Sequence, residues 1–213
     1  MNERRYNFSV RRRAGLWWPG LLAPVLFLGL SVCGTATRSA RGQGGADLVV
    51  RDFCRSFGRQ KGLAVLNLFA DSARFDIDDV SVSFVGPEDI ARLAEYGVAV
   101  HERLVARDLE VAQDMVRCRL EESNDWLALL GVKHAYYVGR FRVSGGRILG
   151  AQLTLVPESR EELTGKLTRF LAWLLVQDPK ALEQLLPGGR PMYDSRVVPQ
   201  LINRLRQWRA RSR

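Results

Sequence analysis

The sequence predicts an α+β fold in which helices cover one face of a strongly curved sheet, with mostly antiparallel strands. Three observations lead to this fold class. Residues 46–100 combine short helical segments with a strand pair, residues 104–156 hold four strand-like segments, and residues 157–213 are helical throughout. Strands and helices that occur in separate runs are typical of α+β proteins.

The helices of the first half are short. Apolar residues recur at helical spacing from Leu48 to Phe57, and Gly58 can end that helix. Residues 63–69 predict a second helix. A third begins at Gly86, because Pro87 fits the first helical position and the acidic residues after it favour the positive end of the helix dipole.

Strands lie between and after these helices. Residues 73–77 and 80–84 alternate apolar and polar side chains, which predicts two strands before the third helix. Longer strands are predicted at the ranges 104–111, 115–121 and 134–143, with a helical insertion at 125–131. Ser144-Gly145-Gly146 predicts a hairpin turn into a final strand at 148–156.

The last part of the chain carries three apolar helical stripes, at residues 163–174, 181–186 and 197–208. Each stripe needs a surface to cover. We therefore expect residues 157–213 to form a helical extension that packs on the sheet domain of residues 46–156.

Residues 1–37 predict a signal peptide or an N-terminal membrane anchor. Five Arg between Arg4 and Arg13 precede an uncharged, largely apolar run at 14–37, and the small residues Gly34-Thr35-Ala36 suit a signal peptidase. A cleaved signal, an uncleaved span and a lipoprotein acylated at Cys33 remain alternatives. Each predicts an extracytoplasmic protein, either secreted or periplasmic, or held at the membrane by the run at 14–37.

The net charge of +9 is carried by the two ends of the chain. Residues 1–45, which include a linker at 38–45, hold seven Arg and one Glu, and residues 204–213 hold five Arg. The segment 46–202 carries 20 basic and 22 acidic residues. Nucleic-acid binding needs a basic face on a folded surface, so we expect no nucleic-acid partner.

The cysteines and histidines form no metal pattern. Cys54 falls on the apolar face of the first helix and Cys118 on a strand, so each is interpreted as a small buried hydrophobic residue, and a disulfide between them stays open. The two histidines of the chain and the absence of a phosphate loop or zinc spacing argue against a metal or another cofactor.

Three motifs, in order along the chain, resemble the nuclear transport factor 2-like superfamily in its SnoaL-like branch. Leu68-Phe69-Ala70-Asp71-Ser72-Ala73 resembles its second-helix-to-first-strand junction, Gly86 with Ile90 resembles the start of its third helix, and residues 141–148 resemble its last hairpin. The resemblance covers about residues 46–156. It implies a cone-like α+β barrel with a pocket between helices and sheet, often dimerising through the outer sheet face.

The resemblance allows the steroid isomerase type of chemistry to be checked residue by residue. The position of its general base falls on Ile77, that of its oxyanion-donating tyrosine on Phe53, and that of its donating aspartate near Gly139. An alkyl group, a phenyl ring and a glycine can neither take nor donate a proton. Carboxylate-base enolisation is therefore not expected, and no catalytic residue is assigned.

The implied pocket would hold a small apolar or amphipathic ligand that the sequence does not identify. Its candidate lining residues are Phe53, Ile77, Trp126, His134, Tyr137 and Phe141. Trp126 lies among leucines, which also fits a core residue.

Two groups of polar residues offer other chemistry. Asp76, Asp78 and Asp79 cluster where the first strand ends and could bind a cation or share a proton, although alternation turns the first two away from Ile77 and favours a solvated strand edge. His134 precedes two tyrosines and could shuttle protons, or it could be a hydrogen-bonded structural histidine.

These observations predict an exported or membrane-anchored, non-catalytic module for small-molecule binding or assembly. The alternative is an enzyme with isomerase-, cyclase- or hydrolase-like acid–base chemistry, and a third interpretation is an envelope-complex subunit held by an uncleaved N-terminal span. Two or more titratable groups that converge inside the barrel would favour an enzyme, and an apolar lining would favour binding.

Overall fold

The computed structural model describes residues 45–59 and 62–211, which form six strands and seven α-helices. A single curved sheet has the strand order β2-β1-β6-β5-β4-β3. The strands are β1 (Phe69–Ile77), β2 (Val82–Val85), β3 (Arg103–Ala112), β4 (Met115–Ser123), β5 (Ala135–Ser144) and β6 (Arg147–Leu155). All neighbouring strands pair antiparallel except β1 and β6, which are parallel, so the predicted α+β fold class is confirmed.

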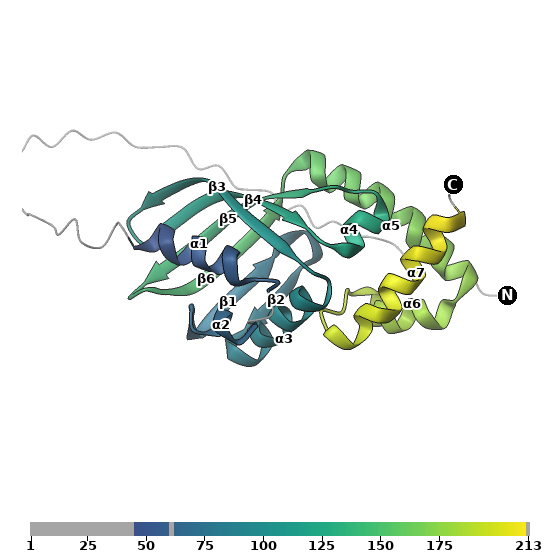
Figure 1. Ribbon diagram of the computed structural model, residues 1–213, viewed down its shortest axis with the longest axis horizontal. Coiled ribbons are helices and arrows are strands. Elements are labelled where there is room, and N and C mark those ends of the chain that lie inside the picture. The colour runs from purple at the N-terminus through teal and green to yellow at the C-terminus, as the bar shows by residue number, and fades with distance from the viewer. Residues whose placement is uncertain (1–44, 60–61, 212–213) are drawn as a thin grey trace, which may run out of the picture. The chain divides into compact units, whose positions relative to one another are not determined.

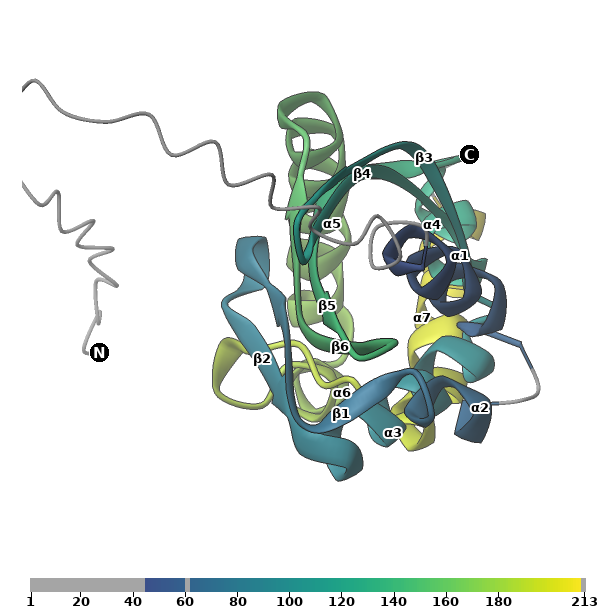
Figure 2. The same ribbon diagram turned by 90° about the vertical axis from the view of Figure 1, so that its left-hand side faces the viewer.

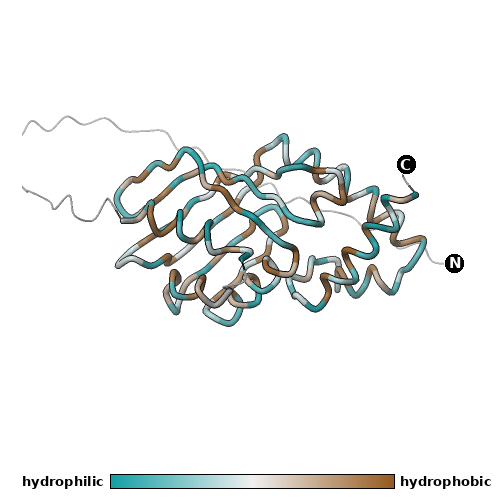
Figure 3. Tube along the Cα trace, viewed as in Figure 1, coloured by the Kyte–Doolittle hydropathy of each residue, from teal (hydrophilic) through white to brown (hydrophobic). Residues whose placement is uncertain are grey.

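The helices lie on the concave side of the sheet and beyond one end of it. They are α1 (Ala46–Ser56), α2 (Gly62–Leu66), α3 (Gly86–Ala99), α4 (Asp125–Leu130), α5 (Pro157–Gln177), α6 (Pro179–Leu185) and α7 (Val198–Arg211). Figure 1 shows α1 crossing the sheet, and Figure 2 shows the sheet curling around that helix. Apolar and polar stretches interleave along nearly every element, as expected where one face of each is buried (Figure 3).

The core on the concave side consists mainly of aromatic rings. The α1 residue Phe53 is fully buried, and its ring centroid lies between 5.2 and 6.0 Å from those of Phe57, Phe69, Phe75 and Phe141. Phe53 of α1 therefore contacts both β1 and β5, which lie on either side of β6 in the sheet.

The helices after Pro157 share this core. Phe170 and Leu174 of α5 and Leu205 of α7 are fully buried in it. Trp208 of α7 meets Phe170 edge to face at 5.8 Å, and the guanidinium of Arg204 pairs with the carboxylate of Asp178 between α5 and α6. In Figure 1 the helices α6 and α7 lie beyond α4, at the end of the sheet where α3 also ends.

Several predicted boundaries differ from the structure, and two of the differences have a clear physical reason. Residues 63–69 were expected to be helical, but α2 ends at Leu66 and β1 already begins at Phe69. The backbone N–H of Ile148 donates to the carbonyl of Leu68 at 2.7 Å, so pairing with β6 determines this boundary. The strand expected at 80–84 is β2 at Val82–Val85, because Asp78–Val80 form a 3-10 turn.

The predicted export segment lies outside the described residues, as do Cys33 and most of the linker at 38–45. Among the helices within 45–59 and 62–211, none is long and apolar enough to cross a bilayer.

Candidate functional site

The predicted pocket residues differ in burial and in the side chains that they contact. Phe53 and Phe141 are fully buried against each other, with ring centroids 5.7 Å apart. Ile77 and Trp126 are half-buried and pack against the core from β1 and from α4. The interior around Phe53 is thus filled by side chains of the protein itself.

His134 and Tyr137 face different environments. The Nδ1 of His134 lies 3.1 Å from Glu121 Oε1 without the geometry of a hydrogen bond, and its ring neighbours that of Tyr136. Tyr137 is buried on the concave side and takes part in another polar cluster, described below.

The carboxylates at the end of β1 are held by structural contacts. Asp76 pairs with Arg74 at 2.8 Å, and Asp78 accepts hydrogen bonds from Gln152 and Thr154. Asp79 accepts from the backbone N–H of Leu155 at 2.6 Å and pairs with Arg160. Asp78 and Asp79 thus connect the 3-10 turn to β6. Within the described residues, no group of three or more His, Cys, Asp and Glu side chains could hold a metal ion.

The resemblance implies a donating aspartate near Gly139, but the side chains around Gly139 leave little room for one. A Cβ on Gly139 would lie 2.9 Å from the ring of Phe141, 3.1 Å from Leu120 and 3.2 Å from the Sγ of Cys118. Gly139 is therefore needed for close packing of the core. The thiols of Cys54 and Cys118 are both free and buried, and burial raises their pKa to about 12 and about 11.

A cluster of titratable side chains lies beside this core, and Tyr137 is its one member among the predicted site residues. Glu122 is buried on the concave face of β4, where Val116, Cys118 and Leu120 precede it at every second position. Besides Glu122, the cluster contains Glu102, Tyr96, Tyr137 and Tyr193, together with the amide of Asn124. Two carboxyl groups and three phenols therefore converge from α3, β4, β5 and the segment before α7.

Glu122 is buried, but side-chain donors bind both of its carboxylate oxygens. The hydroxyl of Tyr137 donates to its Oε2 at 2.6 Å, and the Nδ2 of Asn124 donates to its Oε1 at 2.5 Å. Asn124 is the N-cap of α4, and its Oδ1 accepts from the backbone N–H of Leu127, which orients its amide nitrogen toward Glu122. Both oxygens of Glu122 thus have donors.

Glu102 lies between the end of α3 and the start of β3. A Cβ on Gly97 would lie 3.2 Å from its Oε2 and 2.9 Å from the ring of Phe57, so Gly97 leaves the space that this carboxyl group occupies. No side-chain hydrogen bond to Glu102 is found within the described part of the chain.

The two carboxyl groups differ in their preferred protonation state. Burial, together with the charge of Glu122, raises the pKa of Glu102 well above its ordinary value. Burial also raises the pKa of Glu122, but the hydrogen bonds from Tyr137 and Asn124 oppose that rise. Because only Glu122 has donors for its charged form, Glu102 is the member that keeps a proton.

The neighbouring phenols stay protonated. Burial, followed by the charges of nearby groups that include Glu122, raises the pKa of Tyr96 and that of Tyr137 well above the ordinary value. The ring of Tyr193 lies 5.2 Å from that of Tyr96 and closes the cluster on the side of α7.

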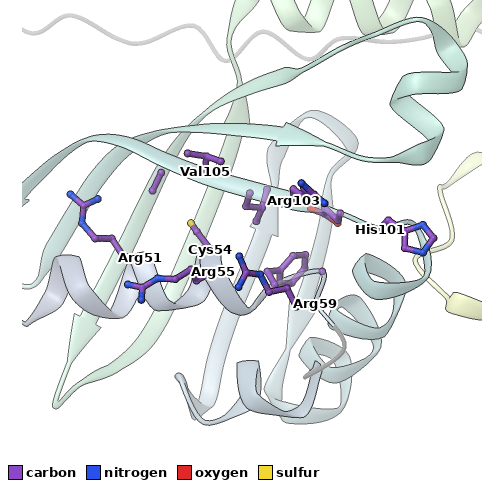
Figure 4. A pocket seen from close by; sticks show the side chains of 12 residues that line it. Arg51, Cys54, Arg55, Arg59, His101, Arg103 and Val105 are labelled. Carbon is purple, nitrogen blue, oxygen red and sulfur yellow. The ribbon is translucent and has the colours of Figure 1, made fainter.

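A groove of about 680 Å³ between α1 and β3 leads to Glu102. Figure 4 shows its labelled side chains along these two elements, with Arg51 and Arg55 on α1 and Arg103 on β3. The groove is narrow at Gly58, where φ is +73° and a Cβ would lie only 1.8 Å from the carbonyl oxygen of Glu102. Because Glu102 lines this groove, solvent reaches the cluster at Glu102.

No family model matches this chain, and the comparison with curated proteins finds no relative in sequence. Several solved structures do match. An M. tuberculosis LEH-like epoxide hydrolase has 15% identity over 63% of this chain and 97% of that chain, with a TM-score of 0.49. A protein with a ketosteroid isomerase-like fold from Catenulispora acidiphila has 15% identity over 55% and 92%, with a TM-score of 0.46.

A third match, a nuclear transport factor 2-like protein of unknown function from Cytophaga hutchinsonii, has 12% identity over 53% of this chain and 91% of that chain, with a TM-score of 0.43. These three structures are similar to this chain in fold. At such identities the likeness concerns the fold alone.

Among the residues of the cluster, Glu122 had a signal in the sequence. This glutamate occupies the fourth inward position of β4 and breaks a period-two apolar pattern. Buried charged residues nearly always have a partner, and they are frequent at functional sites. Glu102 follows a helix end and Tyr193 lies in a segment without regular structure, so no periodicity pointed to them.

Proposed function

We propose that this chain is an acid–base enzyme for a small molecule, with Glu102 as the proton donor at the inner end of the groove. The observation that carries the proposal is the pair of enclosed carboxyl groups, Glu102 and Glu122, in a cluster with three phenols. Perturbed carboxyl groups that converge beside a cavity are typical of active sites.

The two carboxyl groups would have different roles. Glu102 lines the groove, and its raised pKa favours the protonated form, which can donate its proton to an oxygen of a bound substrate. Glu122 is a positioning residue, because its negative charge holds the proton on Glu102 without contact with the groove. A protonated carboxyl group of this kind suits ring opening, hydration or isomerisation.

An assay with a panel of candidate substrates tests this proposal. The protein is incubated with a panel of epoxides, lactones and ketones in H₂¹⁸O or D₂O, and isotope incorporation is followed by mass spectrometry. Glu102→Gln should lower the rate by about 100-fold or more, the usual contribution of a general acid. Glu122→Gln should shift the alkaline limit of activity to lower pH, because Glu102 then releases its proton more easily.

Glu110→Gln on β3 is the matched control, since this exposed glutamate lies outside the cluster. Catalysed incorporation that survives in Glu102→Gln, or an unchanged pH profile in Glu122→Gln, would contradict the proposed roles. Absence of incorporation across the panel, with a small molecule copurifying instead, would favour a non-catalytic binding module.

We also propose that the protein acts outside the cytoplasm. Support comes from the sequence of residues 1–37, with its Arg cluster before an apolar run. Fractionation of cells that express the full chain should place it in the membrane or the exported fraction, and an intact N-terminus in the cytosol would contradict export. A homodimer through the outer sheet face remains a prediction; that face presents Arg117 opposite Arg140 across β4 and β5.

A further inference from the structure

The groove between α1 and β3 is basic along its rim. Arg51, Arg55 and Arg59 follow one another every four residues and line it from α1 and from the turn that follows, and Arg103 lines it from β3. Arg51 and Arg55 are four residues apart on α1 and therefore share one face of it, and Arg59 lines the same groove from the turn after the helix. All four side chains are exposed.

The acidic residues nearby do not balance these charges. Arg51 lies 3.8 Å from Asp47 and Arg55 lies 3.1 Å from Asp52, both on the outer surface of α1. Within the described residues, Arg59 and Arg103 have no carboxylate partner. At least two guanidinium groups at the groove are thus available to a ligand.

The carboxyl group at the inner end does not oppose an anion. Glu102 is the only acidic residue among the described residues that line the groove, and burial beside Glu122 raises its pKa, which favours its uncharged form. A volume of about 680 Å³ fits a small organic molecule. Guanidinium groups favour carboxylates and phosphates, which they bind through two parallel hydrogen bonds.

We propose that the groove binds the anionic group, a carboxylate or a phosphate, of a small molecule whose other end reaches Glu102. This inference rests on the proposed function, because it names the class of substrate for that site. Arg59 and Arg103 would hold the anion, and Arg51 and Arg55 would add to the attraction.

The experiment titrates the full-length protein with inorganic phosphate and with succinate at constant ionic strength, and follows binding by amide chemical shifts in NMR spectra. Signals of Gly58, Arg59 and Arg103 should move and saturate. The double variant Arg59→Gln with Arg103→Gln should raise the apparent Kd by about tenfold or more, as expected for loss of charge-assisted hydrogen bonds.

The control variant combines Arg147→Gln with Arg206→Gln, two exposed arginines far from the groove in sequence and on other elements. It makes the same change in net charge and should leave the apparent Kd within about twofold. Equal weakening in both double variants, or no saturable shift with either anion, would overturn the inference.

Failure of the anion site can be told apart from failure of the proposed enzyme, because anion binding is measured without any reaction. A chain that binds phosphate or succinate at these residues but incorporates no isotope supports the anion site and refutes the enzyme. A chain that incorporates isotope but binds neither anion refutes the anion site alone.

Discussion

Truncation after Pro157 should leave a chain that is insoluble or less stable by several kcal/mol. The removed part contributes Phe170, Leu174 and Leu205, all nearly inaccessible to solvent, and its loss would expose the apolar surface beneath them. At about 25 cal/mol for each Å² of apolar surface, even a few hundred Å² cost several kcal/mol. Chemical unfolding of the truncated and full chains measures the difference.

A single substitution gives the same information where the truncated chain does not fold. Phe170→Ala should lower the free energy of unfolding by about 3–5 kcal/mol, the usual cost for a buried aromatic side chain. Val176→Ala on the same helix is the control, because Val176 is 76% exposed, and it should change stability by less than about 0.5 kcal/mol. Equal effects of the two variants would show that α5 does not pack as described.

Phe53→Ala should also cost about 3–5 kcal/mol. Phe53 is 0% exposed and its ring meets four other phenyl rings, so its removal leaves a cavity that the sheet cannot close. The control Leu48→Ala lies on the same helix at 52% exposure and should have little effect. Thermal and urea unfolding of both variants provide the measurement.

This substitution separates a core residue from a pocket residue. If Phe53 lined a ligand cavity, its truncation would enlarge the cavity and change stability by less than about 1 kcal/mol. That result would show that Phe53 lines the pocket that the family resemblance implied, and it would contradict an interior filled by side chains.

The order of the helices and strands could be predicted because it depends on the spacing of apolar residues along the sequence. Strands β4 and β5 alternate buried residues with more exposed ones at period two, and Gly86-Pro87 marks the start of α3 as expected. The junction of α2 and β1 could not be placed, since the pairing of Leu68 with Ile148 depends on a strand nearly eighty residues away. Tertiary hydrogen bonds override helix propensity there.

The candidate site was harder to predict than the fold. Phe53 and Phe141 were recognised as inward-facing, but the sequence could not tell a lined pocket from a packed core, which depends on how rings from several elements meet. Glu122 had a detectable signal in the pattern of β4. The convergence of Tyr193 with Tyr96 arises only when the segment before α7 folds back onto α3.

The carboxyl pair should make the stability of the fold depend on pH. A glutamate whose pKa is raised by folding binds its proton more tightly in the folded state than in the unfolded state. Its contribution is therefore present in full below the ordinary value of 4.5 and is lost as pH rises toward the raised value. Glu102→Gln removes this dependence and should raise stability at neutral pH relative to the parent protein.

The most direct test of the account is a pH titration of the glutamate side-chain carboxyl carbons by ¹³C NMR, with Glu102→Gln and Glu122→Gln to assign the two signals. The pair should titrate in two steps, with one proton retained well above the ordinary pKa of 4.5, and in Glu122→Gln the signal of Glu102 should titrate at a lower pH. Two independent titrations near 4.5, unaffected by the partner's substitution, would contradict a shared proton and with it the proposed active site.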